Sequence, residues 1–198
     1  MVVNTMNTFL ARHLQDTFQV SPVEAEQIAA FFKPLELKKG EYFLLADQFS
    51  KHLGFIESGL LREFLYHDGR EITKWISGSE YFAVDLGSFL FGKTARVNMQ
   101  ALTDCRLWVL SKTDYAGIGR AVPQWPEIEK MFIARCFTVL EDRVVSHLAL
   151  SAEERYDAFF RYNPELFNQA PLQYLASLLG MTPETFSRIR KKRTRLHS

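Results

Sequence analysis

The sequence predicts an α+β protein with an antiparallel β jelly roll, flanking helices, one long helix and a C-terminal helix-turn-helix. Between residues 35 and 110, short apolar runs are separated by turn residues about every ten positions, which is typical of barrels and jelly rolls. After Pro123, apolar residues recur at helical spacing. Gly180 and Thr182-Pro183 then separate an apolar helical pattern from a basic one, in the manner of one helix, a tight turn and a second helix.

Residues 4–33 are expected to be helical. Ser21 is a good N-cap, Pro22 suits the first helical position, and Glu24 completes a capping box. Pro34 would end the second of two helices, because proline lacks the backbone N–H that a helix interior requires.

Seven strands are expected in the central region. They are residues 35–38, 42–46, 53–57, 60–66, 71–76, 97–102 and 106–111. Asp68-Gly69 lies between two of these runs, which is a strong signal for a β-hairpin.

A long helix is expected over residues 126–149. Its apolar positions form one stripe: Ile128, Met131, Phe132, Cys136, Val139, Leu140, Val144 and Leu148. The stripe can be covered by a second subunit or buried within the same one. Ser151 and Glu154 then form another capping-box pattern, which predicts a new helix after Leu150.

The strongest local signal lies in residues 171–192. Apolar residues line one face of a first short helix, and Ala176 is small where two helices would cross closely. Gly180 supplies a turn with positive φ. Phe186 and Ile189 would then bury the second helix against the first.

The exposed face of this second helix carries residue types that contact nucleic acid. Thr, Glu, Ser and Arg side chains near its start suit base edges, and the lysines that follow suit phosphate. The predicted DNA-binding residues are Thr182, Glu184, Thr185, Ser187, Arg188, Lys191 and Lys192. An ordinary helical hairpin with a basic exposed face is the alternative.

Charge is unevenly distributed. Residues 179–198 hold six Lys and Arg residues and one acid, Glu184, although the whole chain carries a net charge of only +1. A basic end on a mildly acidic body fits a module that binds a polyanion. A solvated basic tail is the other interpretation, and composition alone does not separate the two.

Several classes of protein are disfavoured. No apolar run reaches the roughly 18 residues of a membrane span, and residues 1–13 lack a signal-peptide pattern, so a cytoplasmic location is expected. Cys105 and Cys136 are too few for a disulfide framework or a four-thiolate iron–sulfur site. The histidines show no metal-ligand spacing and no catalytic motif stands out, so we expect neither a metal site nor an enzyme.

Residues 176–191 resemble the recognition segment of transcription regulators in the Crp/Fnr family, especially the group common in Bacteroidetes. The matching positions read Ala-Ser-x-x-Gly-x-Thr-Pro-Glu-Thr-x-Ser-Arg-Ile-Arg-Lys. Glu154-Arg155-Tyr156 is also typical of that group. Residues 55–62 and 69–72 resemble the family's cyclic-nucleotide-binding-like jelly roll, so the resemblance covers residues 20–192.

The resemblance implies a sensor domain at 1–122, a dimerisation helix at 123–150 and a DNA-binding helix-turn-helix at 151–198. It implies a homodimer on a palindromic site in double-stranded DNA, with RNA polymerase as a further partner. Dimer contacts would come from Ile128, Phe132, Cys136, Val139, Leu140 and Val144.

In the family, a glutamate and an arginine four residues apart read base edges, and here they fall on Glu184 and Arg188. The chain departs from the family at Pro183, where another arginine is frequent. Only six residues follow Lys192, so the wing of the winged helix is expected to be truncated.

The resemblance does not extend to the residues that bind a cyclic nucleotide. The family's Gly-Glu pair reads Val84-Asp85, and its phosphate-binding arginine falls on Ala95, with Arg96 one place late. One residue of slip turns a strand side chain to the opposite face, so cyclic AMP is not the expected ligand, although a small alignment gap would restore Arg96. The effector is therefore unknown.

A different small molecule would meet a polar lining in the roll. The expected lining is Tyr81, Asp85, Ser88, Arg96 and Asn98. The alternative is that these side chains only close the roll.

The competing function is a ligand-binding or protein-interaction module with no DNA role, in which the basic helix docks an acidic partner. Salt separates the two, because affinity for duplex DNA falls steeply with salt when several phosphates are contacted.

Overall fold

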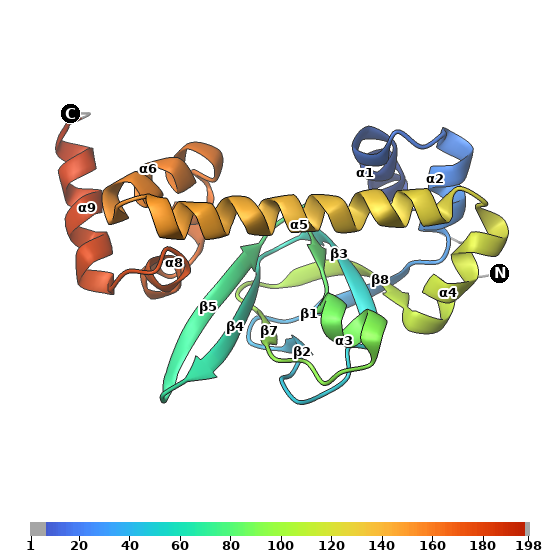
Figure 1. Ribbon diagram of the computed structural model, residues 1–198, viewed down its shortest axis with the longest axis horizontal. Helices are drawn as coiled ribbons and strands as arrows, with labels where there is room; N and C mark the ends of the chain where they lie inside the picture. Colours follow the sequence, from blue (N-terminus) through green and yellow to red (C-terminus); the bar gives the residue numbers. More distant parts are fainter. Residues whose placement is uncertain (1–6, 197–198) are drawn as a thin grey trace. The chain divides into compact units, whose positions relative to one another are not determined.

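The computed structural model describes residues 7–196, which divide into two compact units. Unit 1 contains the chain up to Glu63 together with Ser77–Arg135, and unit 2 contains Phe64–Ile76 together with the residues from Cys136 onward. Figure 1 shows the elements in chain order. These units group residues by their contacts and do not assign functions. The functional ranges 1–122, 123–150 and 151–198 therefore remain predictions.

Unit 1 begins with α1 (Thr8–Phe18) and α2 (Pro22–Ala29). The predicted capping box is present, since the Glu24 N–H donates to the Ser21 hydroxyl at 3.3 Å and the Ser21 N–H donates to the Glu24 carboxylate at 3.1 Å. Positions 4–6 of the expected helix lie outside the described residues.

Two antiparallel sheets form the β roll, with strand orders β1-β8-β3-β6 and β2-β7-β4-β5. The strands are β1 (Lys33–Leu37), β2 (Tyr42–Leu44), β3 (His52–Ser58), β4 (Leu61–His67), β5 (Arg70–Ser77), β6 (Phe82–Ala83), β7 (Asn98–Ala101) and β8 (Cys105–Ser111). All seven predicted strands are present, and the sequence analysis missed only the two-residue β6. Asp68 and Gly69 have φ values of 48° and 72°, as a tight hairpin turn requires.

Helices α3 (Leu86–Phe91) and α4 (Lys112–Ala121) were not predicted. The first is only six residues long, and the second contains two glycines, which weaken a helical pattern. Helix α4 is held by an N-cap, Ser111, whose side chain accepts a hydrogen bond from the Asp114 N–H. The core of unit 1 joins α1, α2 and α4 to the roll through Leu10, Ile28, Phe55, Leu110 and Ile118, each at most 1% exposed.

Helix α5 (Trp125–Ala149) is one unbroken helix of 25 residues, drawn in yellow to orange in Figure 1. It agrees closely with the predicted helix over 126–149. Its chain passes from unit 1 to unit 2 between Arg135 and Cys136.

Unit 2 contains α6 (Ala152–Tyr162), α7 (Leu166–Gln169), α8 (Leu172–Leu178) and α9 (Pro183–Leu196). The predicted capping box at Ser151 and Glu154 opens α6. Aromatic rings form much of the core: Tyr156 lies 5.1 Å from Phe167 and 5.2 Å from Phe186, centroid to centroid. These contacts anchor the start of α9 on α6.

Candidate nucleic-acid interface

Residues 172–196 fold as two helices joined by a tight turn. Gly180 lies in the turn with φ of 64°, and a Cβ atom there would approach the His147 ring to 3.3 Å. Position 180 therefore favours glycine for both its backbone conformation and its surroundings. The Thr185 N–H donates to the Thr182 hydroxyl at 3.3 Å, so Thr182 caps α9 as the sequence predicted.

Helices α8 and α9 pack through small and apolar side chains. Leu175 and Ala176 on α8 are fully buried, as is Phe186 on α9, and Ile189 is 3% exposed. The absence of a bulky side chain at Ala176 lets the two helices approach closely. The packing leaves the opposite face of α9 outward.

The outward face of α9 carries Glu184, Arg188 and Lys191, all exposed and spaced four and three residues apart. That spacing places the three side chains on one side of the helix. Thr185 and Ser187 are half-buried at its borders. The structure thus brings together most of the residues predicted to contact DNA.

Glu184 is held in its ionised form. Hydrogen bonds from its own backbone N–H and from the Thr182 side chain lower the pKa of this carboxyl group below 4.5. A carboxylate at the first turn of a helix is also favoured by the helix dipole. Glu184 is therefore an acceptor at neutral pH, with no donor capacity of its own.

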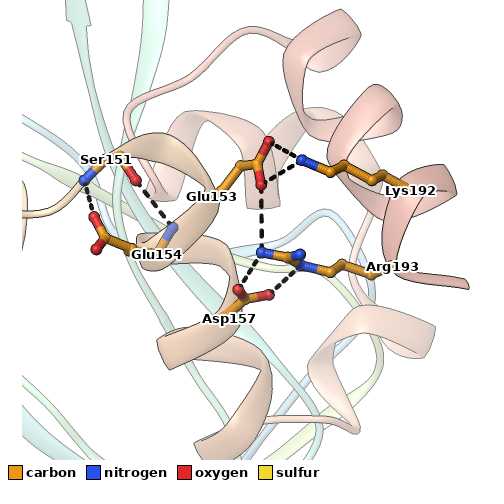
Figure 2. A network of polar contacts seen from close by, with 6 residues as sticks. All are labelled: Ser151, Glu153, Glu154, Asp157, Lys192 and Arg193. Atoms are coloured by element: carbon orange, nitrogen blue, oxygen red, sulfur yellow. Dashed lines mark hydrogen bonds and ion pairs between the residues drawn. The ribbon is translucent and has the colours of Figure 1, made fainter. Parts of the chain in front are cut away.

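Within residues 7–196, Lys192 and Arg193, unlike Arg188 and Lys191, form ion pairs with acids on α6 (Figure 2). Lys192 Nζ lies 2.9 and 3.0 Å from the two carboxylate oxygens of Glu153. Arg193 donates to both oxygens of Asp157, with Nε at 2.8 Å from Oδ1. The sequence analysis assigned Lys192 to phosphate and did not foresee either pairing.

Two arginines that were not singled out as site residues hold the turn between α8 and α9. Arg155 donates from Nε to the Leu179 carbonyl at 2.9 Å and from Nη1 to the Leu150 carbonyl at 2.6 Å. Arg143 Nη2 donates to the Leu178 carbonyl at 2.9 Å. These bonds satisfy carbonyls at helix ends, which have no partner inside their own helix.

The hairpin residues 64–76 pack in the same unit as α8. The Thr73 N–H donates to the Ser177 hydroxyl at 2.9 Å, and the Arg143 guanidinium lies 5.1 Å from the centre of the Trp75 ring. Arg143 also donates to the Lys74 carbonyl. No short-range sequence signal indicates these contacts, because their partners are far apart in the chain.

The predicted dimerisation stripe of α5 divides into two parts. Ile128 is 5% exposed and Phe132 packs against the same core in unit 1, where its ring lies 5.1 Å from that of Phe82. Ile128 is thus buried by its own subunit, which leaves little of it for a second one. Phe132 is only partly buried, against Phe18 of α1 and Phe82 of β6, so its role in a dimer stays a prediction. Cys136 is half-buried.

The remaining stripe is exposed. Val139, Leu140 and Val144 are 48%, 49% and 50% exposed. Phe137, which the prediction omitted, is 64% exposed, and Leu148 is 83% exposed. Helical periodicity identifies which residues are apolar, but it does not identify which neighbour covers them.

Three of the residues expected to line a pocket in the roll accept hydrogen bonds from backbone N–H groups through their side chains. Asp85 caps α3, accepting from the Ser88 N–H at 2.9 Å and from the Arg96 N–H at 3.3 Å. The Ser88 hydroxyl accepts from the Ser50 N–H at 2.7 Å, and Asn98 Oδ1 accepts from the Ala46 N–H at 3.0 Å. These contacts favour the reading in which the side chains close the roll.

Ala95 and Arg96, which lie just before β7, differ in exposure. Ala95 is 1% exposed, whereas Arg96 and Tyr81 are exposed. Among residues 7–196, no three His, Cys, Asp or Glu side chains are arranged to hold a metal ion. None of the described helices, α5 included, combines the length and apolar character of a membrane span.

Residues 34–120 match the protein family described as cyclic nucleotide-binding domain. No curated protein sequence matches the chain. Three solved structures illustrate the similarity of the fold. The catabolite activator protein of Thermus thermophilus has 22% identity and a TM-score of 0.57, over 93% of this chain and 88% of that one.

FixK2 of Bradyrhizobium japonicum has 16% identity and a TM-score of 0.70, over 84% of this chain and 86% of that one. CLP of Xanthomonas campestris, described as a c-di-GMP-responsive global regulator, has 19% identity and a TM-score of 0.66, over 88% and 92%. The chain therefore contains a β roll of the cyclic nucleotide-binding type and has the fold of Crp/Fnr-type regulators.

Proposed function

We propose that the chain is a transcription regulator of the Crp/Fnr type that binds a palindromic site in double-stranded DNA as a homodimer. The observation that carries the proposal is the two-sided character of α9. Phe186 and Ile189 bury one side, while Glu184, Arg188 and Lys191 stand exposed on the other. Within the described part of the chain, Arg188 makes no hydrogen bond or ion pair, so its guanidinium is available to a ligand.

The chemistry of this face suits the major groove. An ionised Glu184 accepts from the N4 amino group of cytosine, and Arg188 donates two parallel bonds to guanine O6 and N7. A good bidentate pair of this kind contributes about 1–3 kcal/mol of discrimination against a wrong base. Lys191 would contact the adjacent phosphates, which supply affinity without sequence preference.

The homodimer is supported by the apolar face of α5. Phe137, Leu140, Val144 and Leu148 follow one another at spacings of three, four and four, and each is at least 49% exposed. Contiguous apolar surface of this kind is rare on a monomer and indicates an interface. A second copy offers an identical face, and two-fold symmetry would present two copies of α9 to successive major grooves.

The other parts of the proposal rest on the family resemblance. They are a small-molecule effector in the roll, contact with RNA polymerase and a cytoplasmic location. The comparisons indicate no catalytic family, and a regulator requires none.

Selection of bound sequences from a random duplex pool, without added ligand, tests the proposal. A palindromic consensus with half-sites about one helical turn apart is the expected result. Sedimentation of the same protein should show a dimer, and Leu140→Glu should shift it toward monomer. If no sequence is enriched, even with a metabolite extract added, the module without a DNA role is the better interpretation.

A further inference from the structure

Four basic residues of α9 fall into two groups. Arg188 and Lys191 lie on the outward face, at helical spacing from Glu184. Arg193 follows Phe186 by seven residues and Ile189 by four, so it lies on the side of α9 that faces α6. Lys192 belongs with Arg193 to the second group, because both are paired with acids on α6.

The second group is paired within the protein. The Glu153 carboxylate accepts from Lys192 and, at 3.4 Å, also from Arg193 Nη2, while Asp157 accepts from Arg193 through both oxygens (Figure 2). The Arg193 side chain is 27% exposed and that of Lys192 is 57% exposed. The hydrogen bond to the Asp157 carboxylate raises the pKa of Arg193 above its ordinary value.

These ion pairs resemble, in their chemistry, the contacts of basic side chains with phosphate. A carboxylate and a phosphate present similar paired oxygens to a guanidinium, and both accept from a lysine ammonium. A cation already paired with a carboxylate has part of its charge neutralised and some of its N–H donors occupied, so it gains less from a contact with a phosphate. An isolated exposed pair contributes little to stability, but here two acids and two bases share one network, and Glu153 joins both bases.

We propose that Glu153 and Asp157 are positioning and specificity-determining residues that substitute for DNA phosphates at Lys192 and Arg193. They fix the second half of α9 on α6 and withhold two cations from sequence-independent contacts. Binding energy then comes in larger proportion from Glu184 and Arg188. This inference rests on the proposed function, because it concerns how α9 engages duplex DNA.

The test is the salt dependence of binding by the full chain. Affinity for random-sequence duplex and for the selected site is measured between 50 and 200 mM salt, a range over which ionic contacts change affinity by orders of magnitude, about 10³–10⁵-fold for six to ten of them. Glu153→Gln leaves the shape of the side chain unchanged and releases Lys192. Asp142→Asn is the matched control, since it removes one negative charge from an exposed position on α5.

Glu153→Gln should steepen the slope of log affinity against log salt by about 0.9, the value for one added phosphate contact. It should raise affinity for random duplex more than for the selected site, so that discrimination falls. Asp142→Asn should change neither quantity. Adding Lys192→Ala to Glu153→Gln should return the slope to that of the wild-type chain, and Lys192→Ala alone should leave the slope unchanged.

Two results would overturn the inference while leaving the proposed function intact. One is a Glu153→Gln protein that binds as the Asp142→Asn protein does. The other is a wild-type slope that becomes shallower by about 0.9 with Lys192→Ala alone, which would show that Lys192 already contacts a phosphate. If the wild-type chain shows no salt-dependent binding to any duplex, the proposed function fails and the inference fails with it.

Discussion

Polar side chains in the β roll and on α9 differ in whether the protein itself satisfies their hydrogen bonds. In the roll, Asp85, Ser88 and Asn98 accept hydrogen bonds from backbone N–H groups of their own unit. On α9, Arg188 and Lys191 are exposed and make no such bonds among the described residues. A side chain whose hydrogen bonds are satisfied internally stabilises the fold, and only one that is left unsatisfied is ready for a ligand.

The buried side of α9 should show the largest effect of any substitution on this helix. Phe186→Ala removes a fully buried ring that contacts Tyr156 and Phe167, and should lower the free energy of unfolding by about 3–5 kcal/mol. Guanidinium unfolding followed by circular dichroism measures it. Ser187→Ala, one residue away and half-buried, is the control and should change stability by less than about 0.5 kcal/mol. Equal stability of the two variants would contradict the packing described.

The outward side should show the reverse pattern, with affinity changed and stability preserved. Arg188→Ala should weaken binding to the selected duplex by about 1–3 kcal/mol and relax base preference at one position. Fluorescence anisotropy with single-base variants of the duplex measures both. Arg96→Ala, an exposed arginine of the roll, is the control and should leave binding unchanged. Unaltered base preference after Arg188→Ala would mean that another residue reads that base.

A substitution at Asp85 in the roll should change stability without changing DNA affinity. Asp85→Ala removes the cap of α3 and should lower the free energy of unfolding by about 0.5–2 kcal/mol, with no change in DNA affinity measured without ligand. Asp85→Asn keeps an acceptor oxygen and should cost less. Thermal unfolding of the three proteins decides the matter. If Asp85→Ala is as stable as the wild-type chain, the carboxylate has a role other than the cap.

The smallest effect expected is a dependence of stability on pH. Burial against Phe55 and Phe82 lowers the pKa of His13 below 6.5. The unfolded chain therefore binds this proton more readily, and the free energy of unfolding should fall as pH drops through 6.5 toward the folded-state pKa. His13→Gln should make the curve shallower between pH 5.5 and 7.5, a range of about one unit on either side of the ordinary histidine pKa. The remaining slope would come from His52, whose pKa burial also lowers. A curve unchanged by the substitution would place the titrating group elsewhere.

DNA base preference should stay constant over the same range of pH. Glu184 has its pKa lowered from 4.5, so it remains ionised wherever His13 titrates. Mild acid would then lower the stability of unit 1, which contains His13, and leave DNA recognition by unit 2 unchanged.

Local patterns were sufficient to predict much of the fold. Each capping box joins residues three positions apart, and the Asp68-Gly69 turn joins neighbours, so the sequence displays them directly. The pattern was weakest where elements are short or rich in glycine, as in β6 and α4. The assignment of hairpin residues 64–76 to unit 2 depends on contacts such as Thr73 to Ser177, which lie 104 residues apart.

Local patterns also predicted part of the candidate site, namely the residues whose positions follow from helical spacing. The outward positions of Glu184 and Arg188 follow from helical spacing once Phe186 is placed inside. The pairing of Lys192 with Glu153 does not, because 39 residues separate them and either could have faced solvent. For Ile128, periodicity predicted an apolar contact but not that its own subunit supplies it.

The division of α9 into an attached side and a free side has a consequence for how such a protein diverges. The residues that attach the helix, Phe186, Ile189 and Arg193, are not those that would meet base edges. If α9 reads DNA as proposed, substitutions at positions 184, 187 and 188 change the preferred operator while the helix stays in place. Under the same proposal, a duplicated gene acquires new targets through a few such changes, with little loss of folded protein.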